Sequence, residues 1–86
     1  MTSYSKARIR KLVRETLAMA PGYGQTEEML KAALDERVAG RVDLSDLRDG
    51  VEWNHGKGYV RSRVNEDTDE KEYLITEAGI SKEDIK

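Results

Sequence analysis

Residues 58–75 decide the fold, and they read GYVRSRVNEDTDEKEYLI. Side chains alternate along the first part, as in a half-buried β-strand. Val60, Ser62 and Val64 share one face, and Tyr59, Arg61 and Arg63 share the other. Residues 65–70 are all polar and are typical of a turn, and residues 71–75 then form a second strand with Tyr73 and Ile75 on one side. Two strands around a polar turn predict a β-hairpin.

Two amphipathic helices are predicted upstream of the hairpin. The first lies near residues 5–19, where Ser5 is an N-cap and Pro21-Gly22 ends the helix. The second covers about residues 27–38, with Thr26 as its N-cap and Gly40 as its stop. The apolar stripes are Ile9, Leu12, Val13, Thr16, Leu17 and Ala20 in the first, and Met29, Leu30, Ala33, Leu34 and Val38 in the second.

A third helix is predicted over about residues 43–56. Its apolar stripe consists of Leu44, Leu47, Val51 and Asn54. Gly50 weakens this helix by about 1 kcal/mol relative to alanine, which leaves an alternative open. In the alternative the helix ends at Asp49, Gly50 is its cap, and residues 51–53 form a strand that turns through residues 54–57. We expect the helix to continue to about His55.

The remaining segments complete a single α+β domain over residues 1–86, with its core at about 5–80. Val42, between two charged residues, is expected to be a short extended and buried position. Thr76 with Glu77 begins a short C-terminal helix or tail, in which only Ile80 and Ile85 could pack. We expect a monomer or a weak homodimer, because about ten residues follow Thr76 and long terminal helices are therefore missing.

Composition narrows the possible functions. The chain has no cysteine, so disulfides, thiolate metal sites and thiol nucleophiles are excluded. It contains neither a membrane-length apolar run nor a signal peptide, and we expect a cytoplasmic protein without a membrane association. Leu, Ile and Val make up about 20% of the chain, but a net charge of −2 favours a folded domain over disorder.

The charge is strongly polarised along the chain. Residues 1–14 carry five basic side chains and no acid, whereas residues 65–86 carry eight acids and three bases. Such a molecule favours one-sided contact with an anionic partner.

The order of three helices and a hairpin, together with local motifs, resembles the winged helix-turn-helix family. The motifs are Thr26-Glu27-Glu28-Met29-Leu30, Val42-Asp43-Leu44-Ser45-Asp46-Leu47-Arg48, Gly58-Tyr59-Val60-Arg61, and Tyr73-Leu74-Ile75-Thr76-Glu77-Ala78-Gly79. They look like the opening of the second helix, the entry to the recognition helix, and the two ends of the wing. The resemblance spans about residues 7–80 and is nearest to small winged-helix proteins of Mu-like bacteriophages.

The resemblance implies a small DNA-binding transcriptional regulator and not an enzyme. In this family the third helix enters the major groove and the hairpin wing lies along the backbone or the minor groove. Carried onto this chain, the base-reading positions are Ser45, Asp46, Arg48, Asp49 and Glu52. The phosphate contacts are Arg41, Lys57, Arg61 and Arg63. The implied partner is double-stranded DNA, and no cofactor or metal is expected.

Acidic side chains on the same surfaces support an alternative. Asp43, Asp46, Asp49 and Glu52 lie along the third helix, and four acids lie between Asn65 and Lys71. Phosphate binding needs cations on one face, so the alternative is a winged-helix module that binds another protein through this helix and wing. A row on the first helix, Lys6, Arg10 and Arg14, is expected to line a solvated face away from the apolar stripe and is a second candidate surface for an anionic partner.

Other patterns are expected to be structural. Asn65, Asp67 and Asp69 have the spacing of a calcium loop, but Glu70 and Thr76 stand where glycine and a bidentate glutamate are required. His55 is the only histidine and the chain has no cysteine, so His55 has no second His or Cys with which to form a metal site. Trp53 is expected to pack the third helix against the hairpin. Tyr59 and Tyr73 are expected to be core or cross-strand aromatics.

Overall fold

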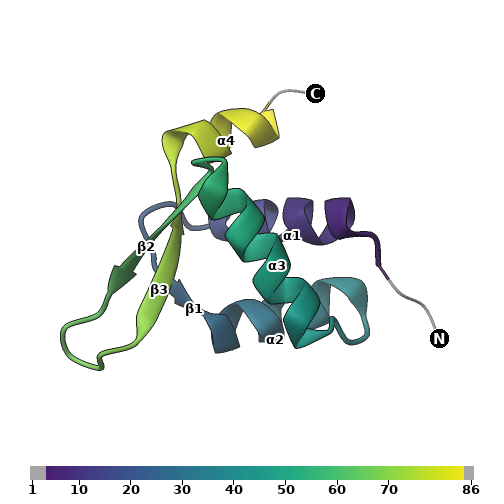
Figure 1. Ribbon diagram of the computed structural model, residues 1–86, viewed down its shortest axis with the longest axis horizontal. Helices are drawn as coiled ribbons and strands as arrows, with labels where there is room; N and C mark the ends of the chain where they lie inside the picture. The colour runs from purple at the N-terminus through teal and green to yellow at the C-terminus, as the bar shows by residue number, and fades with distance from the viewer. Residues whose placement is uncertain (1–3, 85–86) are drawn as a thin grey trace.

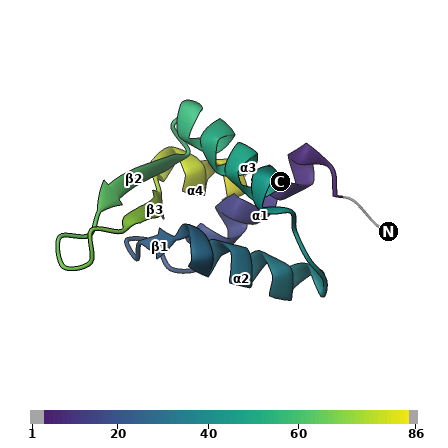
Figure 2. The ribbon, with the colours of Figure 1, turned by 60° about the horizontal axis from the view of Figure 1, so that its bottom comes forward.

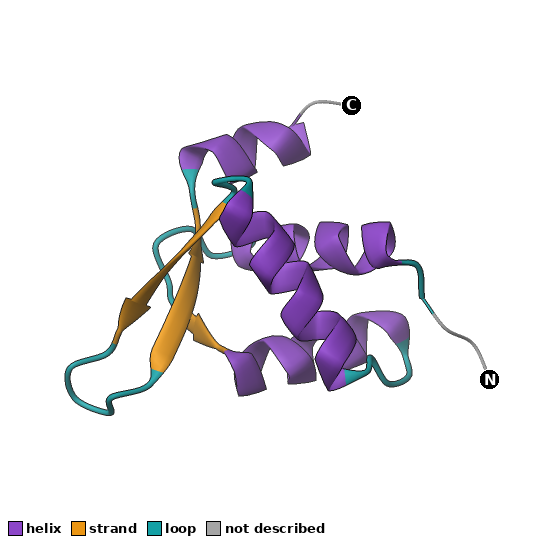
Figure 3. Ribbon diagram, in the orientation of Figure 1, coloured by secondary structure: helices purple, strands orange, loops and turns teal. Residues whose placement is uncertain are grey.

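The computed structural model describes residues 4–84 and has the α+β architecture expected from the sequence. The elements are α1 (Lys6–Ala18), β1 (Gln25–Thr26), α2 (Glu27–Val38), α3 (Leu44–Gly56), β2 (Val60–Val64), β3 (Lys71–Ile75) and α4 (Glu77–Asp84). Figures 1 and 3 show α3 crossing in front of α1, with the β2–β3 hairpin projecting beside the helices. In Figure 2 the tip of this hairpin extends beyond the helical part.

The third helix continues through Gly50 to Gly56, so the alternative with a strand at 51–53 is wrong. The physical reason is the crossing of α3 with α1. A Cβ atom at Gly50 would lie 3.0 Å from Cγ2 of Ile9 and 3.6 Å from the backbone nitrogen of Arg10. Glycine is thus placed where the two helices approach closely, and packing outweighs its low helix propensity.

The sheet has one strand more than the sequence predicted. Its order is β1-β3-β2, all antiparallel, with Gln25 opposite Tyr73 and Val60 opposite Ile75. β1 contains only two residues, too few for an alternating pattern to reveal it. Thr26 still caps α2 as expected, because its Oγ1 accepts from the amide of Met29 at 3.2 Å.

The core lies where the three helices meet the sheet. Its buried apolar residues are Ile9, Leu12, Val13, Leu17, Leu30, Leu34, Val42, Leu47, Val51, Val60, Tyr73 and Ile75. Met29, Leu44 and Val64, which the patterns placed on apolar faces, are 38%, 37% and 60% exposed. Val64 is exposed because the hairpin extends past the helices that cover its base.

The turn between α2 and α3 is held by one carboxylate. Asp35 accepts from the amide of Val42 at 2.7 Å and pairs with Lys31 one helical turn earlier. The Lys31 hydrogen bond, followed by that of the Val42 amide, lowers the pKa of Asp35 from its ordinary value of 3.8. Val42 is 2% exposed, as expected. The helix stop differs: Ala39, not Gly40, takes the left-handed conformation, with φ 53°.

The C-terminal helix packs on the start of the hairpin through Thr76 and Gly79. Thr76 Oγ1 donates to the carbonyl of Gly58 at 2.6 Å and accepts from the amide of Gly79 at 3.1 Å. A Cβ atom at Gly79 would lie 2.2 Å from the carbonyl oxygen of Tyr59. Ile80 packs against the core, and Ile85 lies outside the described residues.

We expect Gly79→Ala to lower the free energy of unfolding by about 1–3 kcal/mol, because the added methyl group meets backbone and α4 must shift. Gly56→Ala is the matched control: a Cβ there has nothing within 4 Å, and the same substitution at the end of α3 should raise stability by up to about 1 kcal/mol. Urea denaturation followed by circular dichroism measures both. Equal effects of the two substitutions would contradict the close packing at Gly79.

We expect Asp35→Asn to lower the free energy of unfolding by about 1 kcal/mol at pH 7, because the neutral amide loses the charged pairing with Lys31. The ionised carboxylate contributes fully above its unfolded-state pKa, and this contribution is lost as the pH falls through the lowered folded-state pKa. The difference in stability between the variant and the wild type should therefore narrow as the pH is lowered through the acidic range. Asp49→Asn, at an exposed position on α3, is the control and should change stability by less than about 0.5 kcal/mol at pH 7.

Candidate nucleic-acid interface

The outer face of α3 carries exposed side chains, and the helix lies beside the hairpin (Figure 1). Its inner face buries Leu47, Gly50, Val51 and Asn54. Among the expected base-reading positions, Ser45, Arg48, Asp49 and Glu52 are exposed and Asp46 is half-buried. The geometry therefore leaves α3 open to insertion in a groove, while its charge is mainly negative.

Arg48 is already paired within the domain. Its Nε and Nη2 atoms donate to the two carboxylate oxygens of Glu27, each at 3.0 Å. This hydrogen-bonded pair lowers the pKa of Glu27 and raises that of Arg48. The guanidinium nitrogens of Arg48 that would bond to guanine O6 and N7 are thus bound to the carboxylate of Glu27. Arg48 must release Glu27 before it can contact a base.

Arg63 on the wing also has a carboxylate partner, through a single hydrogen bond. Its Nε donates to Glu72 on the neighbouring strand at 3.1 Å, and Asn65 donates to the other carboxylate oxygen at 3.2 Å. These two hydrogen bonds, that of Asn65 first, lower the pKa of Glu72. Arg61 is exposed on the same strand, and it takes part in none of the ion pairs between described residues.

The remaining expected contacts lie at the two ends of α3. Arg41 is exposed in the turn before the helix, and its charge contributes to the lowered pKa of Asp35. Ser45, in the first turn, donates to Asp43 at 3.3 Å. Lys57 is exposed at the C-cap, with its Nζ 5.5 Å from the centre of the Trp53 ring.

The expected acidic surfaces are solvent-accessible. On α3 and before it, Asp43, Asp49 and Glu52 are exposed, and at the hairpin tip the exposed acids are Glu66, Asp67, Asp69 and Glu70. Asn65 Oδ1 accepts from the amide of Asp67 at 2.8 Å, a local bond typical of a turn. Among the side chains that the structure describes, no three His, Asp or Glu residues are grouped to hold a metal ion.

The predicted solvated row on α1 needs correction. Lys6 is exposed, but Arg14 is only 7% exposed and its Nη1 donates to Asn54 Oδ1 at 3.0 Å. The guanidinium of Arg10 lies 4.5 Å from the centre of the Trp53 ring. Arg10 and Arg14 therefore face α3, because α3 presents a buried amide and an aromatic ring there instead of an apolar surface.

Trp53 lies between α1 and the start of the hairpin. Its ring centre is 6.0 Å from that of Tyr59, with the two planes tilted by 46°. This contact joins the end of α3 to the residue before β2, as the sequence suggested, while Tyr73 is buried in the core. Sequence reasoning missed that Arg10, Arg14, Trp53 and Tyr59 converge, because they come from three separate segments.

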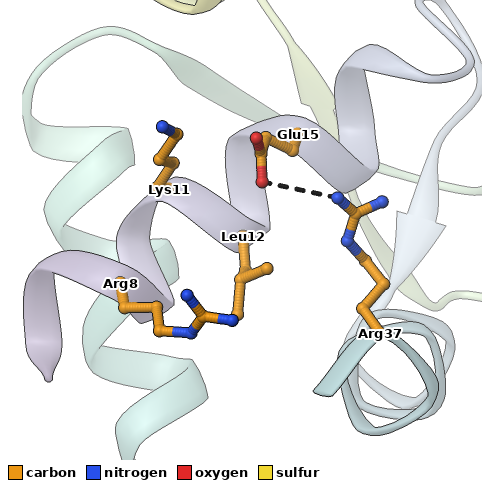
Figure 4. Close-up of a pocket in the computed structure, with 5 residues that line it drawn as sticks. All are labelled: Arg8, Lys11, Leu12, Glu15 and Arg37. Atoms are coloured by element: carbon orange, nitrogen blue, oxygen red, sulfur yellow. Dashed lines mark hydrogen bonds and ion pairs between the residues drawn. The ribbon is translucent and has the colours of Figure 1, made fainter. Parts of the chain in front are cut away.

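A second basic feature lies between α1 and α2. A hollow of about 320 Å³ is lined by the residues drawn in Figure 4: Arg8, Lys11, Leu12, Glu15 and Arg37. Glu15 and Arg37 form an ion pair at 3.4 Å across it. Arg8 and Lys11, which line the hollow, are both exposed.

No helix in the described part of the chain is both long and apolar enough to cross a bilayer.

No family model and no curated protein matches the chain. Solved structures do. A transcriptional regulator from Clostridium thermocellum has a TM-score of 0.77 at 15% identity, with 90% of this chain and 74% of that one covered. RosR of H. salinarum has a TM-score of 0.72 at 19% identity, covering 87% and 67%.

A MarR-family transcriptional regulator from Silicibacter pomeroyi has a TM-score of 0.67 at 25% identity, with 93% of this chain covered. The match covers 47% of the regulator, so this chain corresponds to about half of its length. The chain is similar to all three in backbone arrangement, and it has the winged-helix fold of these transcriptional regulators.

Proposed function

We propose that this protein is a DNA-binding transcriptional regulator that inserts α3 into the major groove and places the β2–β3 wing against the backbone. The observation that carries the proposal is the open outer face of α3 beside a strand with two arginines. The likeness in fold to known transcriptional regulators supports it. A recognition helix flanked by a hairpin matches the width of the major groove.

In this mechanism Ser45 and Arg48 contact base edges, and Arg41, Lys57, Arg61 and Arg63 contact phosphates. The exposed acids limit which sequences are accepted, because Asp49 or Glu52 can accept a hydrogen bond from cytosine N4 but is repelled by phosphates. A monomer would read a single half-site, so useful specificity would need tandem sites or a partner.

Fluorescence anisotropy with a labelled duplex across a salt series tests the proposal. Each phosphate contact contributes about −0.9 to the slope of log binding constant against log salt concentration, so four contacts predict a slope of about −3 to −4. We also expect a Kd below ~10⁻⁴ M at 50 mM salt. Weaker binding or a slope near zero would refute DNA binding.

The pairing of Arg48 makes a second prediction. Glu27→Gln removes the carboxylate that holds the arginine, and we expect duplex affinity to rise by roughly three- to tenfold, the gain of one charge-assisted contact. Glu28→Gln is the matched control, since it removes the same charge from an exposed position one residue later. An equal gain in both variants would show an effect of net charge alone and would argue against base reading by Arg48.

A second candidate function is favoured by the internal ion pairs. Arg48 and Arg63 are neutralised by Glu27 and Glu72, so the surface that remains on α3 and the wing tip is mainly acidic. Such a surface fits a basic protein better than a nucleic acid. A module that binds a basic protein would show no duplex binding in the salt series, and this result would distinguish it from a DNA-binding regulator.

A further inference from the structure

Four cations surround two aromatic rings where α1, the end of α3 and α4 come together. We name this set the basic–aromatic patch: Arg10, Arg14, Trp53, Lys57, Tyr59 and Lys82. From the Trp53 ring centre, the charged groups of Arg10, Lys57 and Arg14 lie at 4.5, 5.5 and 6.0 Å. From the Tyr59 ring centre, those of Arg14 and Lys82 lie at 5.7 and 6.0 Å.

The inner part of the patch is held by buried hydrogen bonds. Asn54 is fully buried, accepts from Arg14, and donates to the carbonyls of Arg10 at 3.1 Å and Gly50 at 2.8 Å. These bonds tie the α1 backbone at Arg10 to α3, while the Trp53 ring supports the Arg10 guanidinium. Because these groups are already ordered, a ligand that binds them has less conformational entropy to remove.

The outer cations of the patch are available for a ligand. Lys57 and Lys82 are exposed and Arg10 is half-buried. None of these three takes part in an ion pair with a carboxylate among the described residues. Arg48 and Arg63, by contrast, already have carboxylate partners. Counterion release on binding a polyanion comes from cations that are not already neutralised.

The position of the patch connects it to α3. Lys57 is the C-cap of the helix, and Tyr59 leads into β2. Figure 1 shows this end of α3 at the same end of the molecule as α4, away from the acidic tip of the wing. A helix lying in a groove about 12 Å wide has a phosphate backbone close to each of its sides. A backbone that passes the end of α3 would meet Lys57, Arg10 and Lys82 together.

We propose that the basic–aromatic patch binds the phosphate backbone of duplex DNA and docks the domain by the C-terminal end of α3. This inference rests on the proposed function and changes its docking mode: the main phosphate clamp is α1, the end of α3 and α4, and not the wing. This docking mode explains how the domain can bind a polyanion although its wing tip is acidic and the wing residue Arg63 is paired with Glu72.

The test compares two double variants that change the charge equally. Lys57→Glu with Lys82→Glu alters exposed positions of the patch, and Arg8→Glu with Lys11→Glu alters exposed positions at the hollow of Figure 4. Anisotropy with a duplex of about 20 base pairs is measured at 50–200 mM salt. Thermal unfolding by circular dichroism checks that both variants fold.

We expect the patch variant to bind the duplex at least about tenfold more weakly than the wild type at 50 mM salt. The magnitude of its salt slope should fall by about 2, because one phosphate contact is lost for each lysine. The control variant should change affinity by less than about threefold. Trp53 is the only tryptophan in the chain, so its emission reports on the patch directly and should change along the same binding curve.

The outcomes separate this inference from the proposed function. If the wild type binds the duplex and both variants lose affinity equally, or the Trp53 emission stays constant, the docking mode is wrong and DNA binding stands. If the wild type leaves the duplex unbound, the proposed function fails and the inference fails with it. If poly-glutamate changes the Trp53 emission at lower concentrations than the duplex does, the patch is a site for an acidic protein and the inference is overturned.

Discussion

The buried amide of Asn54 is the interaction on which the arrangement of α1 and α3 depends. It is 0% exposed, and its three hydrogen bonds join the Arg14 side chain, the Arg10 carbonyl and the Gly50 carbonyl. A buried amide is costly unless its donors and acceptor have partners. The helices must therefore cross in one register, and Gly50 permits the close approach that this register requires. The same amide holds the Arg14 guanidinium against α3, whereas the Arg10 guanidinium lies over the Trp53 ring.

The distribution of paired charges gives the candidate interface its character. The arginines that resemble those of a DNA-reading surface, Arg48 and Arg63, are held by Glu27 and Glu72 on neighbouring elements. Exposed ion pairs of this kind add little to stability, so their main effect is on what the surface can bind. Arg10, Lys57 and Lys82 instead lie near aromatic rings, which attract cations without neutralising them. Net charge alone does not distinguish these two situations.

Most of the elements were predictable because they follow from local physics. Ser5 and Thr26 cap α1 and α2 as expected, since a side-chain oxygen needs only an amide three residues ahead. The hairpin follows from alternation around a polar turn. β1 could not be predicted, because a two-residue strand exists only through its pairing with β3. The exposure of Met29, Leu44 and Val64 could not be predicted either. A periodic apolar pattern shows which face of an element is apolar, but not how much of that face the packed elements cover.

The sequence by itself determined the order and the types of the principal elements, the N-caps of α1 and α2, and the polarity of charge from one end of the chain to the other. Each of these depends on residues a few positions apart. Only the tertiary structure decided which charges are neutralised and which converge. Arg48 meets Glu27 across 21 positions, and Arg14 meets Asn54 across 40. Contacts at such separations arise from the crossing of packed elements, which no local pattern encodes.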